Sequence, residues 1–237
     1  MPTATWERLP EERRRAVLAA AEAEFGAQGF SNGSLNVIAR EAGVSKGSLF
    51  QYFADKADLC AYLADIVSLR IRAHIEANIA DLPWETDFFG ALRGLGHVWV
   101  RYYARHPLEL ALTAAANLEL DPDSRSAVRT AVNRHYIEVL GPLIELGHRS
   151  GQLAADADGD AFLALLMLVL PHLVIAAGNP ELDALLGLGR GTVADGERAV
   201  DRLMEAFRRG FGAAPRRSGR RAATAAATPT TAAAARP

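Results

Sequence analysis

The side chains best suited to chemistry gather in one short stretch, GVSKGSLFQYFADK, at residues 43–56. It holds both lysines of the chain, Lys46 and Lys56, with Gln51 and Tyr52 between them. A catalytic centre needs convergent carboxylates, a histidine or an activated nucleophile, and this stretch offers none of them. Its ammonium, amide and hydroxyl groups are instead donors that suit phosphate oxygens and the edges of bases.

Two short helices are expected to position these groups. Ser34 can cap a helix that stops at Gly43, a residue able to take a positive φ. Ser45 can cap a second helix that runs to about Phe53. Two helices joined by a turn of about three residues form a helix-turn-helix, whose second helix enters the major groove of DNA.

The second helix combines small and polar residues with an apolar back formed by Leu49 and Phe53. The small residues let the backbone approach DNA closely. The residues predicted to contact base edges or the groove are Lys46, Gly47, Ser48 and Gln51. The residues predicted to contact phosphates are Ser34, Tyr52 and Lys56. Two plainer alternatives stay open: Gln51 is solvated only, and Ser34 is a cap that needs no DNA.

This part of the sequence resembles the DNA-binding domain of the tetracycline-repressor (TetR) family, over residues 13–63 of the 237. The features that agree in register are Ile38-Ala39, Ala42-Gly43-Val44, Ser45-Lys46-Gly47, Leu49, Tyr52-Phe53 and Lys56. The resemblance implies the same DNA contacts at the residues named above. Phe50 departs from the family, which commonly has a tyrosine whose hydroxyl contacts a phosphate. Phe50 cannot donate, so we expect it only to pack.

The rest of the sequence shows helical periodicity and no sustained strand pattern, so the predicted fold class is all-α. We expect three parts. Residues 1–56 form an N-terminal three-helix helix-turn-helix domain, and the family resemblance implies that residues 57–212 form a helical ligand-sensing and dimerisation domain. Residues 213–237 form a disordered tail rich in alanine, arginine, threonine and proline.

The last two long helices are expected at residues 158–177 and 195–211. The first of them is strongly apolar, but Pro171 and His172 interrupt it, so we interpret it as a buried helix and not as a membrane span. The protein is then expected in the cytoplasm, associated with the nucleoid when bound to DNA. The family resemblance implies a homodimer through these two helices, and their apolar faces fit that role independently.

Aromatic and polar residues of the later helices predict a pocket for a small, largely apolar effector. The candidates are Trp99, Tyr102, Tyr103, His106, Met167 and His172. The alternative is that these aromatics are ordinary core. We expect no metal site, because the histidines lack ligand spacing, and no cofactor. No nucleophile elbow, phosphate loop or zinc-binding helix motif occurs in the sequence, so we expect no catalytic residues and no enzyme.

Charge adds one constraint on DNA binding. The chain has a formal net charge of −2, so a DNA-binding surface must be a local patch. Modest affinity per subunit follows, and a dimer is expected to compensate. The function predicted is a homodimeric repressor of a palindromic double-stranded operator, released by the effector. The alternative is a ligand-independent regulator, or an activator, with the same fold.

Overall fold

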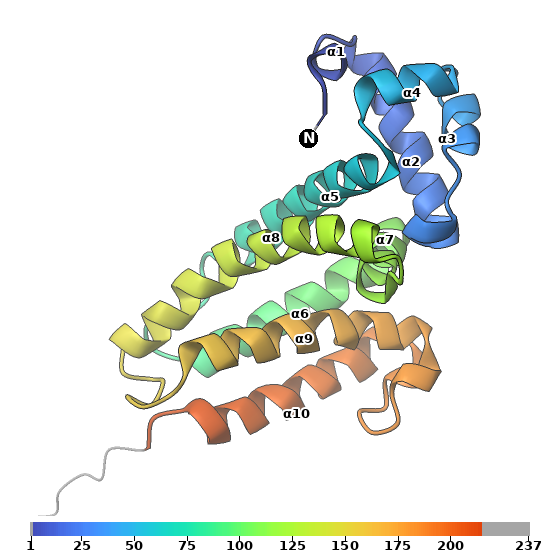
Figure 1. Cartoon of the computed structure of the whole chain (residues 1–237). Coiled ribbons are helices and arrows are strands. Elements are labelled where there is room, and N and C mark those ends of the chain that lie inside the picture. The colour runs from blue at the N-terminus through green and yellow to red at the C-terminus, as the bar shows by residue number, and fades with distance from the viewer. Residues whose placement is uncertain (1, 215–237) are drawn as a thin grey trace, which may run out of the picture.

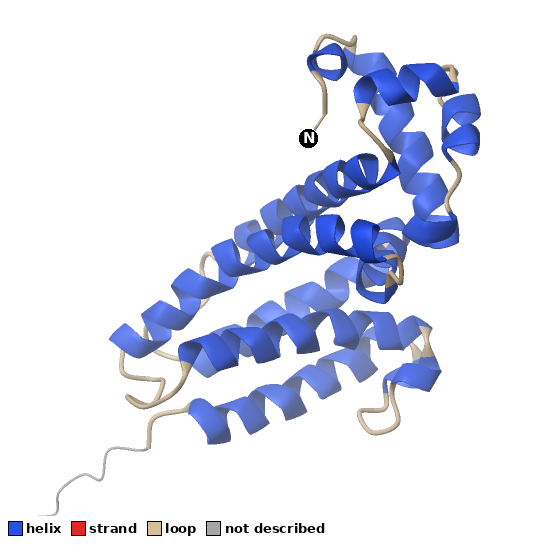
Figure 2. Cartoon of the chain, viewed as in Figure 1, coloured by secondary structure: helices blue, strands red, loops and turns tan. Residues whose placement is uncertain are grey.

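The computed structural model describes residues 2–214, and these residues fold as helices joined by short loops (Figures 1 and 2). The all-α fold class is confirmed for this part of the chain. Its sole β-type pairing there is an isolated antiparallel bridge between Leu153 and Gly212. Most of the predicted tail, residues 215–237, lies outside the described residues.

Four helices form the N-terminal end of the molecule. They are α1 (Ala4–Glu7), α2 (Glu11–Asn32), α3 (Leu35–Glu41) and α4 (Lys46–Tyr52). Helix α2 extends to Asn32, but Gly29, with a φ of 74°, breaks its helical backbone. Helix α1 was not predicted from the sequence.

The larger part of the molecule contains six long helices. They are α5 (Lys56–Ile79), α6 (Phe88–Arg105), α7 (Pro107–Leu118), α8 (Pro122–Arg149), α9 (Gly159–Gly178) and α10 (Val193–Phe211). Two 3₁₀ turns, Pro180–Leu182 and Leu188–Arg190, lie in the glycine-rich loop before α10. Aspartates cap two of these helices: the Asp55 and Asp121 carboxylates accept from backbone N–H groups in the first turns of α5 and α8.

The two parts are joined in two ways (Figure 1). Helix α5 leads directly from the N-terminal helices and lies alongside α8, and α7 packs against α2. A Cβ added at Gly26 of α2 would lie 2.9 Å from Cδ1 of Leu108 on α7, so the end of that leucine side chain would have to shift. The N-terminal helices therefore share a tightly packed boundary with the rest of the molecule.

Helix α9 is long and apolar enough to cross a membrane by length and composition, with a mean hydropathy of 2.4. A core helix of a globular protein passes the same test, and α9 packs on α6, α7, α8 and α10. Its outer side still carries two exposed leucines, Leu165 and Leu168, the latter 68% exposed. Within residues 2–214, these two leucines leave an apolar stripe exposed to solvent.

Candidate DNA-binding face and internal cavity

Helices α3 and α4 form the predicted helix-turn-helix. The turn between them contains Gly43, whose φ of 66° confirms that this position needs a left-handed backbone. The Val44 N–H donates to the carbonyl of Ala39 at 2.9 Å, which closes the turn onto α3. Ser45 caps α4 as predicted, accepting from the Ser48 N–H at 3.0 Å. These local bonds fix the angle between the two helices.

Helix α4 presents opposite faces to solvent and to the core. Leu49 and Phe53, at the back, are each 2% exposed. Lys46, Gly47 and Gln51 are exposed on the other side. The structure therefore brings three of the four predicted base-contacting residues onto one free surface. The fourth, Ser48, is partly buried, and its hydroxyl lies 2.9 Å from that of Ser45.

The three residues predicted to contact phosphates have other bonds in the structure. Ser34 caps α3, with its hydroxyl 3.5 Å from the Val37 N–H. The Lys56 ammonium donates to the carbonyl of Ser31 at 2.6 Å. Tyr52 is buried, and its ring packs on Trp6. Their phosphate contacts stay predictions.

Phe50 differs from the expectation that it would only pack. Its side chain is 48% exposed and belongs to the free face of α4, between buried Leu49 and exposed Gln51. Because a helix turns about 100° per residue, neighbours of a buried position face outward. An aromatic ring thus stands on the candidate DNA-binding surface where the family commonly has a tyrosine.

The unexpected helix α1 supports α4 from behind. The Thr3 N–H donates to the carbonyl of Tyr52 at 2.9 Å, and the Thr3 hydroxyl donates to that of Gln51 at 2.6 Å. Trp6 is 1% exposed, packs on Phe53 with ring centroids 4.9 Å apart, and donates from Nε1 to the Tyr62 hydroxyl at 3.0 Å. The sequence feature that could have predicted this packed segment is a lone tryptophan, Trp6, in a charged N-terminal stretch.

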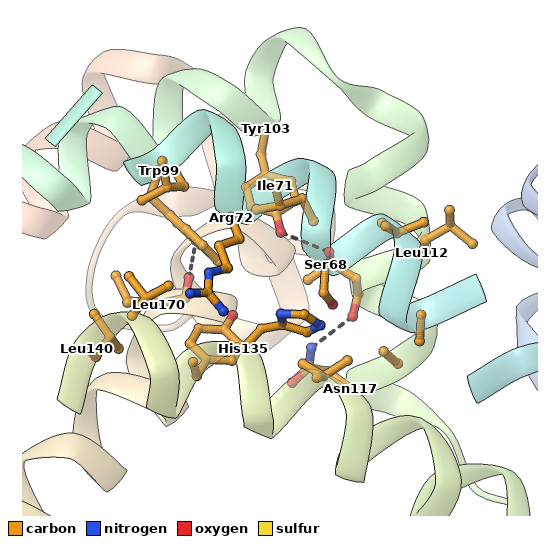
Figure 3. A pocket seen from close by; sticks show the side chains of 18 of the residues that line it. Ser68, Ile71, Arg72, Trp99, Tyr103, Leu112, Asn117, His135, Leu140 and Leu170 are labelled. Atoms are coloured by element: carbon orange, nitrogen blue, oxygen red, sulfur yellow. Dashed lines mark hydrogen bonds between the residues drawn. The ribbon is translucent and has the colours of Figure 1, made fainter. Parts of the chain in front are cut away.

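A partly open cavity of about 70 Å³ lies between α5, α6, α7 and α8, with Leu170 of α9 at one side (Figure 3). Its lining is mostly aliphatic and aromatic. The polar side chains that reach it are Ser68, Arg72, Thr113, Asn117 and His135. Within the part of the chain that the structure describes, no aspartate or glutamate lines it.

The structure separates the predicted ligand-binding residues. Trp99 and Tyr103 line the cavity, where the Trp99 Nε1 donates to the Leu170 carbonyl at 2.8 Å (Figure 3). The Tyr103 hydroxyl lies 2.9 Å from that of Thr113, and burial raises the pKa of this tyrosine.

The other four candidates do not line this cavity. Tyr102 lies on an adjacent face of α6 and stacks on His106, the residue that follows this helix, with ring centroids 4.1 Å apart. Tyr102 also packs on His74 of α5. Met167 and His172 are partly exposed positions of α9, whereas Leu166 and Leu170 face inward from the same helix. Helical periodicity alone did not show which face meets the cavity.

His135 is a cavity residue that the sequence reasoning missed. It lies on α8 in an apolar stripe with Val132, Tyr136 and Val139, and all four line the cavity. A polar residue within such a stripe was the signal that could have found it. Its Nε2 is 2.6 Å from the Oδ1 atom of Asp65 on α5.

The fold and the exposed face of α4 define a helix-turn-helix protein. The family profile described as "Bacterial regulatory proteins, tetR family" matches residues 17–63, which cover this module. Residues 17–63 thus carry the DNA-binding domain of the TetR family of bacterial regulators, and solved TetR-family structures share the fold of the chain. This assignment agrees with the expectation that the protein is not an enzyme.

Two curated relatives match over a stretch of similar length. The HTH-type transcriptional regulator HbdR of Aromatoleum sp. (strain CIB) is 46% identical over 52 residues, which are 22% of this chain and 23% of that protein. A regulator of Staphylococcus aureus (strain USA300) is 40% identical over 53 residues, 22% of this chain and 29% of its own length. The chain thus matches less than a third of the length of these relatives.

Solved structures are similar over most of the chain. A TetR family regulator from Chloroflexus aurantiacus J-10-fl is 26% identical, with a TM-score of 0.55 over 90% of this chain and 99% of that one. FadR of Bacillus subtilis, solved in complex with stearoyl-CoA, is 16% identical with a TM-score of 0.65, covering 80% and 97%. At that identity the second likeness concerns the fold alone.

Proposed function

We propose that this protein regulates transcription by binding an operator through α4 of each subunit of a homodimer. The observation that carries the proposal is the free face of α4, where Lys46, Gly47 and Gln51 stand exposed over a buried apolar back. Lysine and glutamine suit guanine and adenine edges, respectively, in the major groove. The glycine leaves room for the close approach of the helix.

The dimer is proposed to form through α9 and α10. Leu165 and Leu168 form an apolar stripe on α9, and covering them by a second copy removes that surface from water. A twofold axis there would pair two α4 helices with two half-sites. The operator is then a palindrome whose half-sites are about 34–36 Å apart, or a multiple of that distance.

Regulation is proposed to act through the cavity, by release from DNA when a small apolar ligand binds. The cavity adjoins α5 and α7, the two helices that contact the N-terminal part. The Arg70 guanidinium of α5 forms two hydrogen bonds of 3.1 Å with Glu22 of α2 and lies 3.6 Å from Glu109 of α7. A shift of α5 or α7 therefore reaches the DNA-binding helices.

Thermodynamics restricts this mechanism. The ligand must bind the conformer that does not fit DNA better than the one that does, because equal affinities shift nothing. FadR of B. subtilis, which shares this fold, was solved with stearoyl-CoA, a ligand with a long apolar chain beside a charged CoA group. The support for an apolar ligand in the present protein is its own cavity lining, with Trp99, Tyr103 and Leu170.

A ligand-independent regulator or an activator of the same fold is the second candidate. It is expected to fill the central space with side chains. The cavity and its inward polar groups favour ligand response over that alternative.

The test is fluorescence anisotropy of the purified protein on its own upstream intergenic DNA and on a shuffled duplex, over a salt series. We expect a large preference for the upstream DNA, two subunits per site and a steep salt dependence. Lys46→Ala should reduce affinity, whereas Arg93→Ala, an exposed arginine of α6, removes the same charge elsewhere and should not. Equal weakening by both variants would contradict binding through α4.

A further inference from the structure

His135 lies beside the cavity, and within residues 2–214 one of its ring nitrogens is unpaired. The residue is 6% exposed, and its ring points into the same space as Ser68 and Asn117 (Figure 3). The Nε2 atom is bonded to Asp65, but Nδ1 is fully buried and has no hydrogen-bond partner within the described residues. Buried polar atoms in folded proteins almost always have a partner, so this one calls for a partner that binds from outside.

Asp65 decides what the free nitrogen can do. In the tautomer whose Nε2 proton is donated to the carboxylate oxygen 2.6 Å away, Nδ1 carries a lone pair and acts as an acceptor. Arg134 also pairs with Asp65, so the carboxylate stays in place as an acceptor. The cavity thus holds a buried hydrogen-bond acceptor whose natural complement is an O–H or N–H donor.

The charges around the cavity favour a neutral ligand. No carboxylate among the described residues lines it, so a cationic ligand would lack a counter-ion. The arginine that lines it, Arg72, already pairs with Glu76 and Glu138, so it is not free to neutralise an anion. Burial keeps the Tyr103 and Tyr136 hydroxyls neutral by raising their pKa values.

Size and shape limit the apolar part of the ligand. The cavity of about 70 Å³ is smaller than the ~150 Å³ cavity that is known to bind benzene in an engineered protein. A single ring, or an aliphatic group of that size, enters only if the walls separate slightly. The nearby rings of Trp99, Tyr103 and Tyr136 offer a surface on which such a group packs.

We propose that the effector is a compact, neutral molecule with a hydroxyl group, a phenol or an alcohol, that donates a hydrogen bond to His135 Nδ1. This deepens the proposed function, because it names the ligand class for the same cavity. Asp65 acts as a positioning residue that sets which ring nitrogen accepts. Separation of α5 from α8 to admit the ring supplies the conformational change.

The test is isothermal titration calorimetry on the full chain without DNA, with four probes. p-Cresol carries the donor on a ring, and cyclohexylmethanol carries it on an aliphatic body. 4-Fluorotoluene has nearly the shape of p-cresol without a donor, and p-tolualdehyde offers only an acceptor. We expect at least one hydroxyl probe to bind about tenfold more tightly than 4-fluorotoluene, equivalent to about 1.4 kcal/mol.

Variants test whether the preference for hydroxyl probes depends on His135. His135→Leu should abolish it, and His135→Gln, whose amide oxygen can accept, should restore part of it. His172→Leu removes a histidine that does not line the cavity and should leave the preference unchanged. If His135→Leu does not fold, the Gln variant and the probe comparison on the unaltered protein still decide.

Three results would overturn the inference: equal affinity for p-cresol and 4-fluorotoluene, tighter binding of p-tolualdehyde, or no binding of either hydroxyl probe. The readout is independent of the proposed function. If hydroxyl probes bind selectively but leave a DNA complex intact, the inferred ligand class holds and ligand-controlled release from DNA is refuted. If an unrelated ligand releases the operator and no hydroxyl preference is found, release from DNA holds and the inferred ligand class is refuted.

Discussion

Substituting Trp6 tests whether helix α1 is an integral part of the DNA-binding end. Trp6 is 1% exposed and packs on Tyr52, Phe53 and Tyr62. A buried indole removes roughly 200 Å² from water, which at ~25 cal/mol per Å² gives about 5 kcal/mol. Residual burial in the denatured chain reduces this by up to about 40%, to about 3 kcal/mol. Trp6→Ala should therefore lower the free energy of unfolding by about 3 kcal/mol.

A matched variant separates packing from hydrogen bonding. Trp6→Phe keeps an aromatic ring but loses the bond from Nε1 to the Tyr62 hydroxyl, so it should cost less, about 1 kcal/mol. Urea unfolding followed by circular dichroism measures both losses. Since Thr3 of the same segment bonds to the last carbonyls of α4, Trp6→Ala should also weaken DNA binding more than Trp6→Phe.

The reasoning would be refuted by either of two results. The first is a loss below about 0.5 kcal/mol for Trp6→Ala, the range of ordinary surface substitutions. The second is an equal loss for the alanine and phenylalanine variants.

Three further predictions concern other sites. Gln51→Ala should weaken the free energy of operator binding by about 1–3 kcal/mol and relax the sequence preference at one base pair. Lys56→Ala should weaken binding to all sequences alike and lower the salt slope, and anisotropy measures both effects. Equal losses for Gln51→Ala on operator and random DNA would argue against base reading. Leu168→Glu should convert the dimer to monomers in sedimentation, while Leu120→Glu, 82% exposed outside α9, should not; a dimer that survives Leu168→Glu does not use this stripe. Burial raises the pKa of the Cys60 thiol to about 12 from 9.0, so the folded protein should resist thiol reagents, and stability should fall as pH rises above about 9, because the unfolded chain then releases a proton that the folded chain keeps. Fast labelling of the native protein would contradict this burial.

The helix ends and the turn could be predicted because their chemistry is local. Ser45 and Asp55 each accept from a backbone N–H three residues ahead, so the sequence itself contains both partners. Gly43 is equally local, because a positive φ depends on one residue. Such short-range bonds do not depend on the rest of the fold.

The missed features depend on partners far along the chain. Trp6 is buried by residues about fifty positions later, and His135 is bonded to Asp65, 70 positions earlier. The periodicity of α6 placed Trp99 and Tyr102 in one aromatic group, but only the packing of α5 and α8 decides which of them meets the cavity. Tertiary contacts, which a single sequence does not show, determine which of these side chains are buried and which line the cavity.

In the proposed mechanism, helix α5 transmits motion from the cavity to the N-terminal helices as a rigid rod. It is unbroken over 24 residues, so it is about 36 Å long and stiff. From Ile71 at the cavity to Lys56 at its start the distance is about 22 Å, so a tilt of about 5° moves that start by about 2 Å. In a twofold dimer the displacements are opposed, and the spacing of the two reading helices changes by up to about 4 Å against the ~34 Å repeat of DNA. Widening a cavity by less than the diameter of one atom is then enough to put both helices out of register with their grooves.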